Sequence, residues 1–319
     1  MMEDRTLTPL DVSKILRISK NTVYELIKRG ELNCYRVGKK IRIDLKDVEN
    51  YKSRYQDKKQ IPHQEDEIYS SFTNNLLPLS EEYHKNNFII CGQDILLDVL
   101  SRYLQVHPQG VRALRSYVGS YNGLLSLYLG KIQVATSHLW DGDSGEYNIP
   151  FVRRLLPGIP TVIIHLAYRM QGFYVAAGNP KEIKSWEDLK RKDITMVNRE
   201  KGCGTRILLD EHLRLLNINA NSINGYDREC LSHLAAASII SRHGADFAIG
   251  NEKTGLQVKN IDFIPLQKES YDLVLKKQDI DKPEFKAIID ILRSDSFKSE
   301  LEGIGNYDLE NLGDIIAEL

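Results

Sequence analysis

The chain has 319 residues, of which 42% are hydrophobic and 27% are charged, and its formal net charge is −1 at pH 7. This composition is ordinary for a globular protein and excludes collagen-like and broadly disordered chains. No apolar run approaches the roughly 20 residues that cross a bilayer, and the N-terminus lacks the features of a secretory signal. We therefore expect a cytoplasmic protein without a membrane partner.

Charge is unevenly distributed along the chain. Residues 1–60 hold 15 lysines and arginines against 9 acidic residues, whereas the remainder holds 28 against 35. A basic unit joined to an acidic body predicts that only the N-terminal part meets a polyanion such as nucleic acid. The four cysteines are scattered without a C-x-x-C pair, which predicts neither a disulfide framework nor a structural zinc site. They are Cys34, Cys91, Cys203 and Cys230.

The first elements follow the order helix, turn, helix, hairpin, helix. Thr8-Pro9 begins a helix, and Ser19 is an apt N-cap for a second helix over residues 20–29. A hairpin with a basic tip follows over residues 32–43, and a last helix is expected over residues 44–55. This order and the short turn between the first two helices predict a winged helix-turn-helix in residues 1–57.

Polar side chains outside the apolar stripe of the second helix are candidates for contacts with DNA. Asparagine and threonine can reach base edges, whereas lysines and arginines suit phosphates. The alternative is a solvated surface on a small packing module. The candidates are Lys20, Asn21, Thr22, Tyr24 and Lys28 on the helix, and Arg36, Lys39, Lys40 and Arg42 on the wing.

The segment LTPLDVSKILRISKNTVYELIKRGELNCYRVGKKIRIDLKDVENY strongly resembles the excisionase-type, MerR-like winged helix-turn-helix family. The specific parts are S-K-N-T-V-Y, R-G-E-L and R-V-G-K-K-I-R-I. Members of that family bind double-stranded DNA through the second helix and the wing, which implies the same use of the residues just named.

Residues 58–86 are polar and turn-rich, and we interpret them as a linker, with one short helix near residues 68–77. From residue 88 to 319, short apolar runs alternate with helical patterns, which is typical of βαβ units. The segments 161–177 and 262–276 are too long for ordinary strands, and we expect them to cross between two lobes. Further helices are expected over residues 95–104, 124–129 and 229–242, and one that follows the motif of residues 198–206 and ends at residue 216. Strands are expected over residues 88–91, 111–118, 132–136, 194–197 and 246–250.

Four junctions between strands and helices are candidates for a ligand site. They lie at Cys91-Gly92-Gln93, Gly119-Ser120, residues 202–205 and residues 226–229. Small residues let free N–H groups approach a ligand, and helix dipoles favour negative charge there. Two junctions in each lobe predict a small oxyanion held between the lobes.

The segments GSYNGLLSLYLGKIQVATSHLWDGDSGEYN and NREKGCGTRILLDEHL resemble cytosolic periplasmic-binding-protein-like domains related to molybdate- and tungstate-binding proteins. Members fused to a helix-turn-helix act as oxyanion-responsive regulators. The resemblance implies an α/β fold with a two-lobed, type II ligand-binding domain over residues 87–319. The family often has serine at Cys203, and Ser/Cys-His-Asp where this chain has Cys91-Gly92-Gln93-Asp94.

The candidate ligand-binding residues follow from these junctions and motifs. Ser120 and Thr205 are the best hydroxyl donors, and Arg199 and Arg206 could neutralise charge. The full set is Cys91, Gly92, Gly119, Ser120, His138, Tyr147, Arg199, Cys203, Gly204, Thr205, Arg206 and Tyr226. As helix caps, salt-bridge partners or loop residues, the same side chains would have purely structural roles.

The sequence thus predicts a homodimeric, DNA-binding regulator that senses molybdate or tungstate and has no cofactor or metal site. One alternative is a regulator that senses a small organic metabolite, for which Tyr147, Tyr168 and Tyr226 leave room. The other is an enzyme that uses Cys203, but no His-Asp partner for that thiol is evident, so we expect no catalytic residue.

Overall fold

The computed structural model describes residues 6–16, 18–29, 31–38, 40–48, 51 and 87–319. The chain divides into two compact units, residues 1–74 and 75–319. The predicted linker lies outside the described residues, as do its boundaries and Lys39. Of the helix expected over residues 44–55, residues 45–48 and 51 are described and are helical.

The N-terminal unit has the predicted helix-turn-helix and wing. Helix α1 (Pro9–Leu16) precedes α2 (Lys20–Lys28), and Ser19 caps α2 by accepting a 3.1 Å hydrogen bond from the Thr22 amide. Strands β1 (Thr6–Leu7), β2 (Tyr35–Val37) and β3 (Lys40–Asp44) form a sheet in the order β1-β3-β2. Val12 of α1, Val23 of α2 and Ile43 of β3 are fully buried and belong to the apolar core of this unit.

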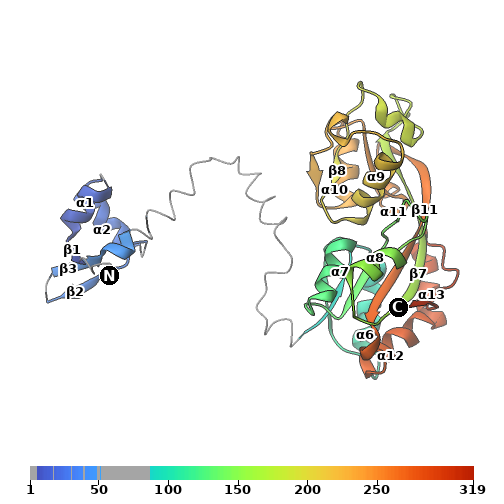
Figure 1. Ribbon diagram of the computed structural model, residues 1–319, viewed down its shortest axis with the longest axis horizontal. Coiled ribbons are helices and arrows are strands. Elements are labelled where there is room, and N and C mark those ends of the chain that lie inside the picture. The colour runs from blue at the N-terminus through green and yellow to red at the C-terminus, as the bar shows by residue number, and fades with distance from the viewer. Residues whose placement is uncertain (1–5, 17, 30, 39, 49–50, 52–86) are drawn as a thin grey trace. The chain divides into compact units, whose positions relative to one another are not determined.

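The larger unit consists of two lobes joined by two long strands, β7 (Thr161–Ala176) and β11 (Ile261–Lys276) (Figure 1). These strands pair antiparallel along their whole length, so the predicted crossing segments are confirmed. The sheet has the order β10-β7-β11-β6-β4-β5, with β12 also paired to β7.

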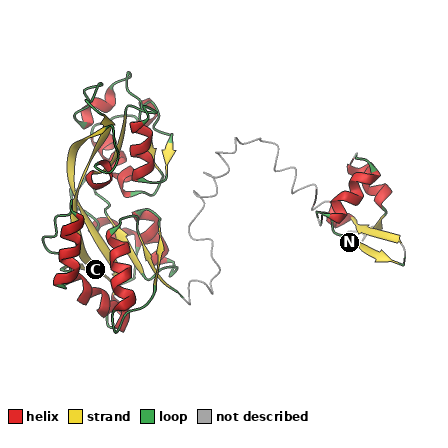
Figure 2. Cartoon of the chain, turned by 180° about the vertical axis from the view of Figure 1, so that it is seen from behind, coloured by secondary structure: helices red, strands yellow, loops and turns green. Residues whose placement is uncertain are grey.

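The first lobe contains β4 to α8 together with the C-terminal elements. Its elements are β4 (Phe88–Cys91), α6 (Leu96–Val106), β5 (Ala113–Ser116), α7 (Ser120–Tyr128), β6 (Val134–Ser137), α8 (Ile149–Leu155), η3 (Lys277–Asp279), α12 (Pro283–Leu292), α13 (Asp295–Ile304) and β12 (Ile315–Glu318). Helices cover both faces of the sheet (Figure 2). Two buried apolar clusters form its core, one on α6 and α12 and one on α7 and α8.

The second lobe lies between the two crossings. Its elements are η1 (Trp186–Lys190), β8 (Asn198–Arg199), α9 (Gly204–Leu215), η2 (Ala220–Ser222), β9 (Glu229–Cys230), α10 (His233–Ser241), β10 (Phe247–Asn251) and α11 (Glu252–Gly255). Phe173, Phe247 and Leu209 lie in one of its two apolar clusters, which pack against the far halves of β7 and β11.

Several predicted boundaries need correction. The helix expected over residues 229–242 begins at His233, because Ser232 caps it by accepting from the Ala235 amide, while Glu229–Cys230 pairs with β8. The helix expected over residues 124–129 begins at Ser120, directly after the extended Gly119. In the segment expected to be a strand over residues 194–197, Met196 forms an isolated bridge to Phe247, and the strand β8 follows it.

Candidate functional site

A small cavity lies where the two lobes meet. Its walls come from the first lobe (Gln93, Asp94, Val118, Gly119, Ser120, Thr136, His138), the second lobe (Cys203, His233, Asn251) and the crossing strands (Arg169, Tyr271). About 20 Å³ is open to the centre of a water-sized molecule. That is room for about one water.

The N-terminus of α7 meets the N-terminus of α9 across this cavity. Gly119 packs so closely on the second lobe that an added Cβ would lie 2.6 Å from both the Cys203 Cα and the Gly202 carbonyl oxygen. The Tyr121 amide donates to that same carbonyl oxygen at 3.1 Å. Gly204 lies equally close to the His138 ring. The positive ends of two helix dipoles are therefore brought together.

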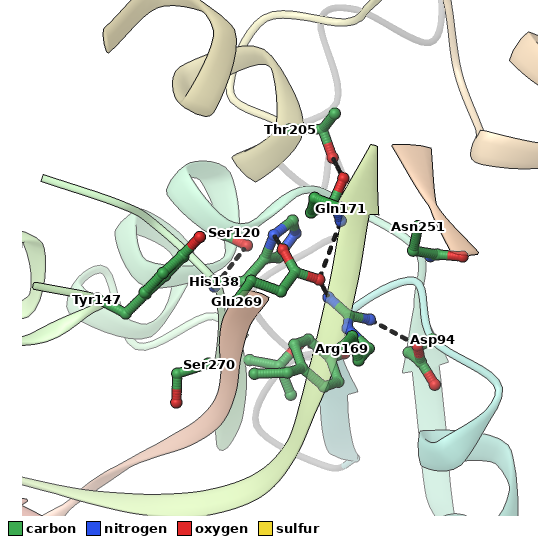
Figure 3. Close-up of polar contacts among 12 residues, drawn as sticks. Asp94, Ser120, His138, Tyr147, Arg169, Gln171, Thr205, Asn251, Glu269 and Ser270 are labelled. Atoms are coloured by element: carbon green, nitrogen blue, oxygen red, sulfur yellow. Dashed lines mark hydrogen bonds and ion pairs between the residues drawn. The ribbon is translucent and has the colours of Figure 1, made fainter. Parts of the chain in front are cut away.

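A network of buried charges forms the floor of the cavity (Figure 3). Arg169 of β7 and Glu269 of β11 are cross-strand neighbours, and Nη2 of Arg169 lies 2.5 Å from Oε1 of Glu269. Nη1 of Arg169 donates to Oδ2 of Asp94 at 2.5 Å. The guanidinium also lies over the Tyr271 ring, 3.8 Å from its centroid. One cation is thus shared by two carboxylates.

His138 connects this network to the second lobe. Its Nδ1 lies 2.7 Å from Oε2 of Glu269, and its ring packs against Gly204 of α9. Gln171 donates to Oε1 of Glu269 at 2.9 Å, and Thr205 of α9 donates to Gln171 at 3.5 Å. Glu269 therefore receives contacts from both β7 and the first lobe, and through Gln171 it is linked to α9.

The surroundings of Glu269 keep it ionised. Burial opposes ionisation, but Arg169 and His138 outweigh it and lower the pKa of Glu269 to about 2. For Arg169 the cost of burial is likewise exceeded by the attraction of Glu269 and Asp94, and its pKa is raised. Burial raises the pKa of the Cys203 thiol despite the nearby Arg199. Cys203 is therefore a neutral thiol at neutral pH.

A second, larger cavity continues outward from the first. It shares Gln93, Asp94, His233 and Asn251 with the inner cavity, and about 190 Å³ of it is open to the centre of a water-sized molecule. Its further walls include Ile95, Ser232, Leu234, Lys253 and Gln257. The side chains of Ile95 and Leu234 are exposed and come from opposite lobes. The outer cavity could accept a ligand longer than an inorganic anion.

Away from the cavities, the lobes are also joined by the loop of residues 140–147. Trp140 stacks on His212 of α9 with 4.6 Å between ring centroids, and Trp186 stacks on the other side of His212 at 4.0 Å. The Gly142 amide donates to Oε2 of Glu211 at 3.0 Å. Burial lowers the pKa of His212, which favours the neutral imidazole in this stack.

The predicted ligand residues occupy three different positions. Gly119, Ser120, His138 and Cys203 line the inner cavity, and Gly204 and Thr205 contact its walls. Cys91 and Gly92 lie behind it: Cys91 is fully buried, with burial raising its pKa to about 12, and the space beside Gly92 is filled by Thr136 and Tyr271.

The remaining predicted residues bond within the protein. Arg199 donates from Nη2 to Oε1 of Gln93 at 2.6 Å and so links the lobes. Tyr147 accepts from Gln267 at 2.8 Å. The Arg206 guanidinium lies 4.1 Å from the centroid of Tyr226, whose hydroxyl donates to Asp210. Within the described part of the chain, Arg206 and Tyr226 line neither cavity.

The charged centre of the site, formed by Asp94, Arg169 and Glu269, is not among the residues predicted from the sequence. Asp94 directly follows the predicted junction Cys91-Gly92-Gln93. Arg169 and Glu269 lie inside the long strands β7 and β11, which the sequence marks mainly by their apolar residues. A usable signal did exist, because a buried charge within an apolar strand requires a partner. Thr136, His233, Asn251 and Tyr271 were missed as well, whereas Gln93 belongs to a predicted junction.

Four of the predicted DNA-binding residues line one groove of the N-terminal unit. A groove of about 310 Å³ is lined by Lys20 and Tyr24 of α2, Lys40 and Arg42 of β3, and the residues Thr8, Pro9, Leu10 and Ile41. Lys20, Asn21, Thr22, Tyr24, Lys28 and Lys40 are exposed. Arg36 belongs to β2, opposite Ile41.

The described residues contain neither a candidate metal site nor a candidate membrane-spanning helix. No group of three or more histidine, cysteine or acidic side chains is placed to hold a metal ion. No helix there is long and apolar enough to cross a membrane.

Comparison with known proteins agrees with this architecture. The sequence profile of the PBP superfamily domain matches residues 101–293, and that of a helix-turn-helix domain matches residues 6–55. The chain belongs to the PBP superfamily. Its larger unit is a PBP-like domain, and its smaller unit is a helix-turn-helix domain of the excisionase-like type.

Two relatives share substantial sequence identity with this PBP-superfamily protein. YvgK of Bacillus subtilis is 39% identical over 318 residues, which cover all of both chains. A Clostridium pasteurianum protein from the 5′ region of a 2Fe-2S ferredoxin gene is 66% identical over 113 residues, 35% of this chain and all of that protein.

Solved structures share the fold at low identity. A putative phosphate transporter substrate-binding protein from Clostridium perfringens, with bound phosphate, has a TM-score of 0.51 and 14% identity, covering 70% of this chain and 99% of that one. An H2O2-bound OxyR mutant from Corynebacterium glutamicum has a TM-score of 0.50 and 13% identity, covering 93% and 89%.

Proposed function

We propose that this protein is a transcriptional regulator whose binding to double-stranded DNA responds to a small oxyanion held between the lobes, with molybdate and tungstate as the first candidates. The observation that carries the proposal is the meeting of the α7 and α9 N-termini across the inner cavity, at Gly119 and Cys203. Backbone amides and the Ser120 hydroxyl are donors suited to an oxyanion. DNA binding would place the protein in the cytoplasm.

The small inner cavity suggests how an anion could act. An anion with four oxygens needs more room than one water, so its binding must move side chains or hold the lobes further apart than here. A ligand shifts such an equilibrium only by its difference in affinity for the two states. We propose that this shift changes how a homodimer of N-terminal units fits an inverted repeat. A monomeric mass at micromolar concentration would contradict the dimer.

The test is a thermal-shift panel on the full chain with molybdate, tungstate, sulfate, phosphate and simple carboxylates. An anion at 100 times its Kd should stabilise the protein by about 2.7 kcal/mol. Ser120→Ala should reduce the shift, because it removes one donor from the cavity wall. The absence of a shift with every anion would refute oxyanion sensing.

A small organic ligand is the second candidate, and the outer cavity of about 190 Å³ favours it. Such a ligand would place an anionic head near Ser120 and its body between Ile95 and Leu234. A carboxylate that stabilises the protein more than any inorganic anion would decide for this candidate. We propose no catalytic role, since the Cys203 thiol is buried with a raised pKa.

A further inference from the structure

The charges around the inner cavity pose a problem for an anionic ligand. Asp94 and Glu269 share the single guanidinium of Arg169. With a neutral His138, this cluster has one negative charge in excess. A dianion placed beside it would be repelled, because charges in a poorly solvated site interact strongly. Some group must supply positive charge when the anion binds.

His138 is placed to supply it. Oε2 of Glu269 lies 2.7 Å from Nδ1 of His138, and an ionised carboxylate can only accept, so Nδ1 carries a proton. In the neutral ring Nε2 then has a lone pair and no hydrogen. In the described structure no hydrogen bond engages Nε2, Gly204 at the N-terminus of α9 packs over the ring, and His138 lines the inner cavity. Only the protonated ring can donate there to an oxyanion.

We propose that an oxyanion binding in the cleft takes up one proton at Nε2 of His138, which makes His138 the residue that couples anion affinity to pH. This inference rests on the proposed function. The imidazolium would lie between the ionised Glu269 and the anion and would cancel the excess negative charge. The other titratable or charged groups near His138 are Arg169 and Tyr271 of the crossing strands, Asp94, Cys203 and Arg199, and His233 of α10.

None of these neighbours is a better proton acceptor. Arg169 is already protonated, and burial raises the pKa of Cys203 and Tyr271, which keeps both protonated. Burial, together with Arg199, Arg169 and His138, holds the pKa of His233 well below its usual range. His233 therefore stays neutral, and uptake falls to His138, the imidazole that pairs with the Glu269 carboxylate.

The sign of the effect follows from linkage. The complex holds one proton more than the free protein and the free anion, so affinity is greatest at low pH. Affinity then falls by up to about tenfold per pH unit as the pH rises. Molybdate and sulfate are suitable ligands, since their own charge does not change between about pH 6 and 9, the range in which histidine commonly titrates.

The experiment is calorimetric titration of molybdate and sulfate into the full chain across that range, in two buffers of different ionisation enthalpy. We expect uptake of about one proton per anion on the alkaline side of the free imidazole pKa. His138→Gln keeps an amide donor but cannot titrate, and its affinity should not change with pH. The control is His107→Gln at the C-terminus of α6, which should behave like the parent chain.

A second measurement covers the case in which His138→Gln binds no anion. Side-chain NMR of the parent chain at alkaline pH should show one imidazole becoming protonated when molybdate is added, and its signal should be missing from His138→Gln. Anion binding without proton uptake, or proton uptake that persists in His138→Gln, would overturn the role of His138 but leave oxyanion sensing intact. A lack of binding by both anions would overturn it together with oxyanion sensing.

Discussion

Two buried histidine–carboxylate pairs lie in the described part of the larger unit, residues 87–319, and they differ in what surrounds them. Nδ1 of His138 lies 2.7 Å from Glu269, and Nδ1 of His165 lies 2.8 Å from Asp272, so both carboxylates come from β11. Glu269 also contacts a guanidinium and stands beside a cavity. Asp272 instead accepts from the neutral groups of Asn148 and Ser270.

The difference shows that such a pair does not by itself make a site. Nε2 of His165 is buried without a hydrogen-bond partner in the described structure, and His165 lines neither the inner nor the outer cavity. Its network holds Asn148, at the end of the loop of residues 140–147, in a left-handed conformation (φ 62°). Of the two pairs, it is the Glu269 pair that lies beside α9 of the other lobe, and for that reason we propose a role in binding for it. The comparison predicts that mutations at Asp272 affect stability and those at Glu269 affect binding.

Asp272→Ala should have the largest effect on stability. It leaves the buried donors of Asn148, His165 and Ser270 without their acceptor, and removing one member of a buried polar network costs about 3–5 kcal/mol. Urea unfolding of the full chain measures this. Anion affinity of the folded variant should be unchanged, and a loss of affinity at equal stability would break the comparison.

Glu269→Gln should cost less stability, about 1–3 kcal/mol, because Asp94 still pairs with Arg169. Its main effect should be on binding, since the proposed proton uptake at His138 depends on the Glu269 carboxylate beside it. We expect anion affinity to lose its pH dependence. Unchanged pH dependence in this variant would show that the two pairs do not differ in function.

Acid should remove the stabilising contribution of Glu269. Its pKa is lowered in the folded protein from 4.5 to about 2, so its contribution is fully present above pH 4.5 and is lost as the pH falls to about 2. The stability difference between the parent chain and Glu269→Gln should therefore shrink over that range. Denaturant unfolding at several acidic pH values tests this, and a constant difference would contradict it.

Ser270→Ala should have the smallest effect. Its hydroxyl donates to Asp272 at 2.7 Å, but Asp272 keeps His165 and Asn148 as partners. A single neutral hydrogen bond contributes about 1 kcal/mol. Thermal unfolding measures the change. A loss as large as that of Asp272→Ala would mean that the hydroxyl, and not the carboxylate, organises this network.

The fold could largely be predicted from the sequence, because its signals are local. Ser19 caps α2 as its position suggests, and the length and apolar character of residues 161–176 and 261–276 reveal the crossings. The predicted helix start at residue 229 was wrong, because the N-cap at Ser232 makes the helix begin at His233 although the helical sequence pattern starts earlier.

The site could be predicted only in part. Glycine junctions mark Gly119 and Gly204, whose close contacts leave no room for a side chain. The pair of Arg169 and Glu269 joins residues 100 positions apart, and only the register of β7 against β11 brings them together. Sequence alone supplies no register across such a distance. The positions of Arg206 and Tyr226 outside both cavities depend in the same way on packing.

The most direct test is a crystal of the full chain grown with tungstate, in which anomalous scattering locates the tungsten. The account predicts tungsten between the α7 and α9 N-termini, with oxygens within hydrogen-bond distance of the Ser120 hydroxyl and Nε2 of His138. Tungsten bound only outside the cleft, with Gly119 and Cys203 still in contact, would contradict it.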